Sequence, residues 1–318
     1  MRVSKMIDNI SLKVPQQDDT GFTGRLQDLW RRDIHTYSGH IQNMGVYKNL
    51  DGIIIHGSLA KYLNGENLTP LTWGHVKEAI RKLEVETGLD LSMTIVKSVE
   101  IGISIFTKEK PSEYLKLFGN PAIFTRREFS KSTGLETITY ATKTGAFQFT
   151  GYDKIQEMKS RKGNLHLSFS NDKNVLRLEY KIVRRRGIYA RFKRDLMAYD
   201  LFDRNIYRKL QGLFWDAYQA IPKLGRQCYF NKLDNITPTK WTEILAEQYR
   251  QICPKECLHL QQTLRESGAL SDKSRERIRA EERRRAKDFS MSDKSPLVAE
   301  LDELVRGQFV AYLKTSIT

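Results

Sequence analysis

Several short segments in the first two thirds of the chain alternate apolar and polar residues, which is the pattern of strands with one buried face. The clearest is residues 98–106, in which Glu100 lies on the polar side and branched aliphatic residues form the other side. Residues 10–14 and 175–183 alternate in the same way. We therefore predict strands that each have one apolar and one polar face.

Residues 135–152 have the pattern of a β-hairpin that turns at residues 143–145. In the second strand two phenylalanines share the apolar side, whereas Tyr152 falls on the polar side. From Asp153 the spacing of polar residues changes to that of a short helix. Tyr152 is therefore predicted to lie at the junction of a strand and a helix, facing away from the core.

The other segments give a coarse order of elements. Residues 53–68 predict a buried strand that enters a loop, and the next helix begins near Thr72 and ends at Gly88. After about residue 195 the pattern is helical. We therefore predict an α+β fold, with an N-terminal antiparallel-sheet domain over residues 1–195 and a mainly helical, basic region over residues 196–318.

The charge of the chain narrows the choice of partner. Its 318 residues include 53 Lys and Arg against 38 Asp and Glu, a net charge of +15. Such an excess favours a polyanionic partner, because basic side chains neutralise phosphates and release counterions. No apolar run approaches the roughly 18–20 residues of a membrane span, and the N-terminus has no segment typical of a signal peptide. We therefore expect nucleic acid, no membrane and a cytoplasmic protein.

The basic residues are concentrated in two segments. Residues 181–194 hold seven basic and no acidic side chains, and residues 273–287 hold eight basic and three acidic ones. Each segment is open to two interpretations, a solvated surface with ion pairs or a direct contact with DNA. The candidate DNA contacts in them are Lys181, Arg184, Arg185, Arg186, Arg283 and Arg284.

The cysteines exclude one class of protein. Three cysteines are too few, and odd in number, for a disulfide framework. Cys253 and Cys257 lie close to His259, but a fourth zinc ligand at useful spacing is missing. We therefore predict no structural zinc site.

The polar faces of three predicted strands carry the candidate chemistry. If their apolar sides form one core, then Glu100, Glu179 and Tyr152 all project from the opposite face of the sheet. Carboxylates bind Mg²⁺ or Mn²⁺, a metal ion polarises a phosphodiester, and a tyrosine hydroxyl can attack phosphorus. A free tyrosine phenol has a pKa of about 10, and the positive charge of Lys154 would favour its ionised form, the phenolate. The competing interpretation is that the tyrosine is structural and the glutamates are solvated or ion-paired.

Four segments resemble, in order, the replication initiators of filamentous bacteriophages, the gene II/X family, and related rolling-circle initiators of phages and plasmids. Residues 53–68 resemble a segment ending in Ser-x-Ala-Lys-x-Leu-x-Gly-x-Asn, and residues 96–105 resemble a strand carrying an acid at the place of Glu100. Residues 135–157 are similar to the hairpin that ends in the nicking tyrosine. Residues 175–186 are similar to an Arg-x-Glu strand with a basic tail.

This resemblance implies an antiparallel-sheet nuclease domain of the Rep/HUH-like type that uses Mg²⁺ or Mn²⁺. Carried over by position, Tyr152 becomes the nucleophile and Lys154 its cationic neighbour, while Glu100 and Glu179 become metal ligands. Related initiators often use a His-hydrophobe-His pair, which this chain lacks. His56 is either a further ligand or a packed structural histidine. The further DNA contacts implied are Lys61 and Arg177, although the segment around Lys61 has an equal interpretation as a shaped loop.

The first hypothesis is a replication initiator that nicks and rejoins one strand of an origin through a 5′-phosphotyrosine in the bacterial cytoplasm. Its expected partners are double-stranded origin DNA, the nicked single strand, a host helicase and a host DNA polymerase. The alternative is a non-catalytic, sequence-specific DNA-binding protein such as a repressor or a degenerate initiator. A conjugative relaxase would share the chemistry. The sequence leaves the origin and the oligomeric state open.

Overall fold

A computed structural model describes most of the first 223 residues and a helix near the C-terminus. The described residues are 7–15, 22–33, 36–68, 71–119, 121, 124–127, 135–162, 174–223 and 296–313, with isolated positions between 263 and 280. The strands are β1 (Ile7–Val14), β2 (Gln27–Arg31), β3 (Tyr37–Ile41), β4 (Met44–Asn49), β5 (Gly52–Ser58), β6 (Ile95–Thr107), β7 (Thr125–Arg127), β8 (Thr137–Ala141), β9 (Phe147–Asp153) and β10 (Asn174–Ile182).

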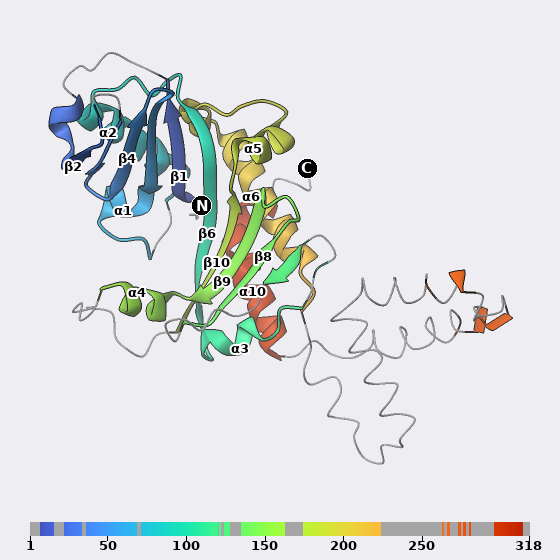
Figure 1. The fold of residues 1–318 in the computed structure, drawn as a ribbon. Coiled ribbons are helices and arrows are strands. Elements are labelled where there is room, and N and C mark those ends of the chain that lie inside the picture. The colour runs from blue at the N-terminus through green and yellow to red at the C-terminus, as the bar shows by residue number, and fades with distance from the viewer. Residues whose placement is uncertain are drawn as a thin grey trace.

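The ten strands of the described residues belong to one sheet in the order β2-β3-β4-β5-β1-β6-β10-β9-β8-β7, and every neighbouring pair is antiparallel. β6 is the longest strand, with 13 residues, and it joins the two halves of the sheet (Figure 1). The large antiparallel sheet with its helices confirms the α+β prediction.

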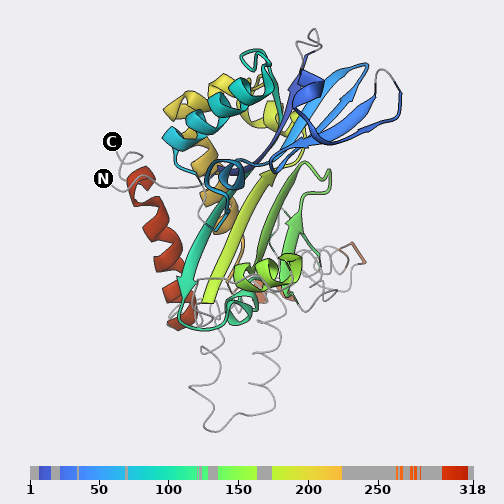
Figure 2. The same ribbon diagram turned by 90° about the vertical axis from the view of Figure 1, so that its left-hand side faces the viewer.

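Helices pack against this sheet. They are η1 (Phe22–Arg25), α1 (Leu59–Asn64), α2 (Trp73–Thr87), α3 (Pro111–Leu115), α4 (Lys154–Lys162), α5 (Arg185–Phe192), η2 (Ala198–Phe202), α6 (Arg204–Ala220) and α10 (Pro296–Leu313). Figure 2 shows α2, α6 and α10 gathered along one side of the sheet. The apolar faces of the strands are buried beneath this layer in one hydrophobic cluster.

The predicted strands and hairpin are present. β6 contains residues 98–106, with Val99 and Ile101 buried on the core side. β8 and β9 form the hairpin, and Gly145 in its turn adopts a φ of 64°, a conformation that glycine reaches without steric cost. The change of period after Tyr152 corresponds to the passage from β9 into α4.

The helix expected between Thr72 and Gly88 is α2. Thr72 accepts a hydrogen bond from the His75 backbone, and Gly88 ends the helix in the left-handed conformation. The prediction for residues 53–68 was wrong in one respect, because β5 is followed by α1 and not directly by a loop. The Ser58 hydroxyl begins α1 by accepting a hydrogen bond from the Lys61 backbone, so a short capped helix was mistaken for a loop.

Two helices from the predicted C-terminal region share the core of the sheet. Phe214 of α6 packs against Phe149 of β9, with ring centroids 5.7 Å apart, and stacks on Phe309 of α10 at 5.4 Å. The division of the chain at residue 195 stays a prediction. Arg283, Arg284 and the cysteines at 253 and 257 lie outside the described residues. Among described helices, none is long and apolar enough to cross a membrane.

A core substitution tests this packing. Leu178 of β10 is completely buried, so Leu178→Ala is expected to lower the free energy of unfolding by about 2–5 kcal/mol through lost burial and a cavity. Urea denaturation followed by circular dichroism measures the change. Val85→Ala is the control, because Val85 is 77% exposed. Equal unfolding midpoints for the two variants would contradict the fold.

Candidate active site

The polar face of the sheet brings together side chains from β10, β9 and β6. Arg177 pairs with Tyr152 across β10 and β9, while Lys181 pairs with Glu100 across β10 and β6. Since paired residues of antiparallel strands project from the same face, these side chains share one surface with Glu179, which lies between Arg177 and Lys181 on β10. The predicted common face of Glu100, Glu179 and Tyr152 is therefore present.

Sequence reasoning missed one carboxylate, that of Asp8. Ile10, Leu12 and Val14 alternate on the apolar side of β1, so simple parity places residue 8 there too. The register shifts between Ile7, which pairs with Ile101, and Ile10, which pairs with Val99. Asp8 and Asn9 of β1 therefore lie opposite the single residue Glu100 of β6, which is a β-bulge. The extra residue turns the Asp8 side chain toward the polar face. The sequence gives no signal for this bulge beyond an acid at a position expected to be apolar.

Asp8, Glu100 and Glu179 form a carboxylate cluster whose oxygens, one from each residue, all lie within 4.8 Å of one another. The Tyr152 hydroxyl donates a hydrogen bond of 2.7 Å to Glu179 Oε1. The cluster and Tyr152 line a cavity of about 310 Å³. The phenol oxygen therefore opens beside the carboxylates and is not enclosed in the hydrophobic core.

Arg177 holds two members of this cluster, Asp8 and Glu179, in place. Its side chain is 0% exposed, and its guanidinium contacts Asp8 Oδ2 at 2.5 Å and Glu179 Oε1 at 3.0 Å. It also donates to the Ser104 hydroxyl at 3.0 Å. The prediction that Arg177 contacts DNA was wrong, because a completely buried guanidinium with three partners cannot reach a phosphate on the surface.

Gly102 provides the space for that guanidinium. A Cβ at residue 102 would lie 2.6 Å from Arg177 Nη2 and 2.8 Å from its Cζ, closer than van der Waals contact allows. The missing side chain lets the arginine cross from β10 over β6 to reach Asp8. Residue 102, on the polar face of β6, must therefore be a glycine, because a larger side chain would collide with the guanidinium of Arg177.

Burial and like charges raise the pKa of two carboxyl groups in the cluster. Desolvation, with the neighbouring Glu179 and Asp8, raises the pKa of Glu100 to about 7. Desolvation also raises the pKa of Asp8, although Arg177 opposes it. Arg177 pairs with Asp8 and Glu179, and the partly exposed Lys181 pairs with Glu100. The three carboxylates thus outnumber these two cations, and a further cation would reduce the repulsion between them.

The environment of Tyr152 differs from the expected one. Burial, followed by the Glu179 carboxylate, raises the pKa of the Tyr152 hydroxyl well above its ordinary value. Lys154 lies near the phenol, with Nζ 5.9 Å from the ring centroid, but it is almost completely buried and paired with Glu157 at 2.9 Å. Lys154 is therefore a neighbour of Tyr152 whose charge is already balanced.

The donor set fits a divalent cation such as Mg²⁺ or Mn²⁺. All three side chains offer carboxylate oxygens, the ligands these hard cations prefer. Glu100 keeps a hydrogen bond from Asn9 at 2.6 Å, and Asp8 accepts one from Ser58 at 2.5 Å. These contacts orient the carboxylates, as outer-shell partners do around metal ligands. His56 lines the same cavity but does not belong to the carboxylate cluster.

The predicted basic contacts are distributed differently along the chain. Lys181 is 39% exposed and lies 3.4 Å from Glu100, at the rim of the cavity. Arg185 forms two hydrogen bonds with Asp195, the acidic residue that directly follows the basic segment 181–194. Arg186 donates to the Thr144 carbonyl. Arg184 is exposed, and Lys61 of α1 is half-buried.

Comparisons with known proteins add little to this geometry. No protein-family model and no curated protein sequence matches the chain. Among solved structures it is similar to a rolling-circle replication initiator protein from Geobacillus stearothermophilus. The identity is 12% and the TM-score 0.32, with 60% of this chain and 78% of that chain covered. A similarity of this size does not establish function.

The buried cation can be tested by substitution. Arg177→Met leaves Asp8 and Glu179 without their common partner, and we expect the free energy of unfolding to fall by about 3–5 kcal/mol. Urea denaturation at neutral pH measures the loss. Arg184→Met, which removes an exposed arginine, is the matched control and should change little. An Arg177→Met protein as stable as this control would contradict the described network.

The raised pKa of Glu100 predicts a pH dependence of stability in EDTA. The folded carboxyl binds a proton up to pH about 7, whereas its ordinary pKa is 4.5. Between these values the folded chain binds more protons than the unfolded chain, so stability falls as pH rises, by an amount on the order of a few kcal/mol. Glu100→Gln should flatten this decline in urea unfolding measured across the range. An unchanged slope would contradict the assignment.

Proposed function

We propose that this chain is a metal-dependent endonuclease and strand transferase that nicks one DNA strand with Tyr152. The observation that carries the proposal is the position of the Tyr152 hydroxyl, 2.7 Å from Glu179, in a cavity that also contains Asp8 and Glu100. A nucleophile, a proton acceptor and a set of oxygen ligands thus meet on one surface of a basic protein.

The reaction follows from these groups. The Tyr152 oxygen forms a bond to phosphorus while the bond from phosphorus to the 3′ oxygen of the preceding nucleotide breaks. The phenolic proton passes to Glu179, which already accepts its hydrogen bond, and the departing 3′ oxygen takes up a proton from solvent water to become a hydroxyl. Because a phosphodiester bond is exchanged for a phosphotyrosine bond, attack by a 3′ hydroxyl reverses the step and rejoins the strand without ATP.

Neighbouring residues would bind the metal ion, position Glu179 and contact the substrate phosphate. Asp8, Glu100 and Glu179 would hold Mg²⁺ or Mn²⁺, which polarises the phosphodiester and neutralises charge that develops on it. Arg177 fixes Glu179 relative to Tyr152 through its contact with Oε1. Lys181, at the rim of the cavity, is placed to meet a backbone phosphate of the substrate.

The biological role that fits this chemistry is initiation of rolling-circle replication. The resemblance of four segments to phage and plasmid initiators supports it, together with the net charge of +15. The protein would bind a double-stranded origin in the bacterial cytoplasm, retain the 5′ phosphate on Tyr152 and leave a 3′ hydroxyl. A host helicase and DNA polymerase would then act at the nick. The exposed Arg184 and the basic segment containing Arg283 and Arg284 are the proposed DNA contacts outside the cavity.

The test is the covalent intermediate. Supercoiled DNA carrying the gene with its flanking sequence is incubated with the protein and Mn²⁺, denatured, and analysed for protein-linked 5′ ends. We expect a linked product whose DNA-bearing peptide contains Tyr152, and loss of that product in Tyr152→Phe or in EDTA, because the nucleophile or the metal is then missing.

Tyr189→Phe is the matched control, because Tyr189 is 55% exposed and lies on α5, outside the cavity. It should retain the product. Linkage of DNA to another tyrosine would show that Tyr152 is not the nucleophile. Specific DNA binding without any linked product would instead favour the non-catalytic DNA-binding protein.

A further inference from the structure

One row of side chains crosses the open face of the sheet from the edge strand β2 to β1. Trp30 pairs with Ser38, Ser38 with Tyr47, Tyr47 with Ile54, and Ile54 with Lys13. Paired residues share a face, so these five side chains lie side by side. Trp30 is 59% exposed and Tyr47 is 39% exposed, with the small Ser38 between them.

A second row, one pair closer to the active site, joins this face to the cavity. His40 pairs with Gly45, Gly45 with His56, His56 with Ser11, and Ser11 with Ser98. The His56 imidazole lies over Gly45, where a Cβ would be 2.8 Å from Cε1. His56, Ser11 and Ser98 also line the cavity that contains Tyr152, so the aromatic row and the cavity are parts of one continuous surface.

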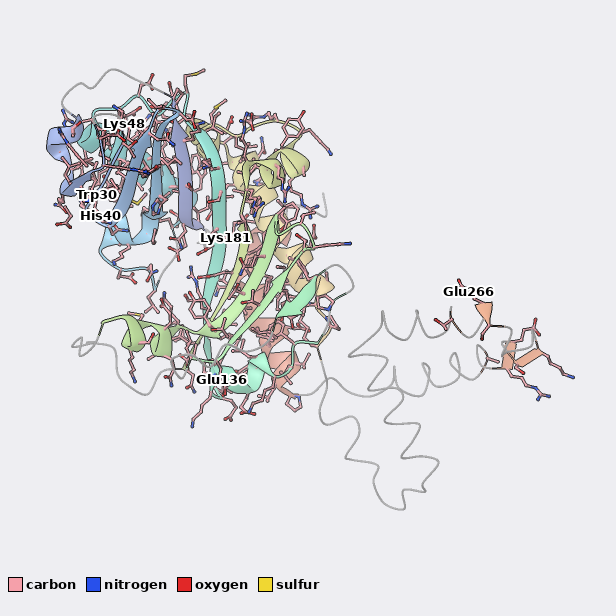
Figure 3. All side chains as sticks on the ribbon, viewed as in Figure 1. Trp30, His40, Lys48, Glu136, Lys181 and Glu266 are labelled. Carbon is pink, nitrogen blue, oxygen red and sulfur yellow. The ribbon has the colours of Figure 1, made fainter. Side chains whose placement is uncertain are left out.

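The charge of this surface suits a phosphate backbone. Lys13 lies at the β1 end of the aromatic row, and a register shift leaves Lys97 half-exposed beside Ser98. Neither lysine forms an ion pair within the described part of the chain. The two rows themselves contain no carboxylate. Figure 3 shows Trp30 and His40 close together near the β2 edge, with Lys181 farther along the sheet.

We propose that this face, the aromatic track, binds single-stranded DNA and leads it to Tyr152. The track consists of Trp30, Tyr47, His40, His56, Lys13 and Lys97. The inference deepens the proposed function and rests on it, because it extends the substrate site of that reaction. Exposed aromatic rings stack on unpaired bases, and lysines between them meet phosphates. A duplex offers no free base faces to such rings, so the track favours a single strand.

The dimensions and the edge strand support this occupant. Seven strand steps separate β2 from β9, and at about 4.8 Å for each step the track spans on the order of 35 Å, enough for several nucleotides. A second copy of the chain pairing along β2 is disfavoured, because a bulge between Gln27 and Trp30 disrupts this edge and Asp28 within it adopts a φ of 49°.

The test measures binding without cleavage. Full-length protein carrying Tyr152→Phe is titrated in EDTA against fluorescent oligothymidylate of about twelve nucleotides, a length within the range of known single-strand sites, and anisotropy is recorded at fixed salt. Trp30→Ala is expected to weaken binding about fivefold or more, since one lost base stack has at least this effect. Trp30→Ala combined with Tyr47→Ala should weaken it further, and Trp30→Phe should retain most of the affinity.

An abasic oligonucleotide of the same length separates stacking from charge. Trp30→Ala should bind it as the parent protein does, whereas Lys13→Gln should weaken binding to both oligonucleotides. Val85→Ala on α2 is the control for an exposed apolar side chain and should bind normally. Equal affinity of the parent and the doubly substituted protein for oligothymidylate would overturn the proposal. Dimerisation that Trp30→Ala abolishes, with DNA binding intact, would assign the face to a second copy.

This binding assay is independent of nicking. If the protein with native Tyr152 forms no covalent product but Trp30→Ala still weakens oligothymidylate binding, the proposed reaction fails and the track stands as a binding surface. If the covalent product forms at Tyr152 while Trp30→Ala binds as the parent does, the reaction stands and the track is wrong.

Discussion

The candidate site depends on one buried cation, the guanidinium of Arg177. It lies under two carboxylates, those of Asp8 and Glu179, and contacts both. Without it, two like charges would be buried close together with little solvent to separate them. Because a guanidinium is planar and carries five donors, one side chain can hold groups from β1 and β10 in fixed positions, with a further contact to Ser104 of β6. The carboxylate cluster is thereby assembled before any substrate or metal arrives.

Two irregularities of the sheet make room for this arrangement. The bulge in β1 turns Asp8 away from the core side, and the absent side chain of Gly102 leaves space for the guanidinium to pass. Bulges commonly lie next to active sites because they redirect a side chain without ending the strand. In this chain the bulge and the glycine occur on neighbouring strands, while the register between β6 and β10 runs without a shift from Thr107 to Val99.

The distribution of charge separates structural from accessible basic groups. Lys154, Arg177 and Arg185 each form an ion pair within the described residues. The net positive charge of the sequence is therefore larger than the number of unpaired cations that a ligand can contact near the cavity. What remains unpaired on the described part of the open face is Lys13 and Lys97, while the partly exposed Lys181 at the rim is itself paired with Glu100 at 3.4 Å. The net charge therefore indicates a polyanionic partner, whereas the paired and unpaired cations determine where it can approach.

The sequence by itself determined β1, β5, β6, β10, the β8–β9 hairpin, the limits of α2 and the polar face shared by Glu100, Glu179 and Tyr152, because these follow from local alternation and capping; it did not predict β2, β3, β4 or β7. Tertiary structure alone decided the role of Asp8, since a bulge reverses parity and depends on pairing between β1 and β6. It also decided that Arg177 and Lys154 are buried. Long basic side chains turn either toward solvent or toward an acid, and only the positions of acids distant in sequence select between the two.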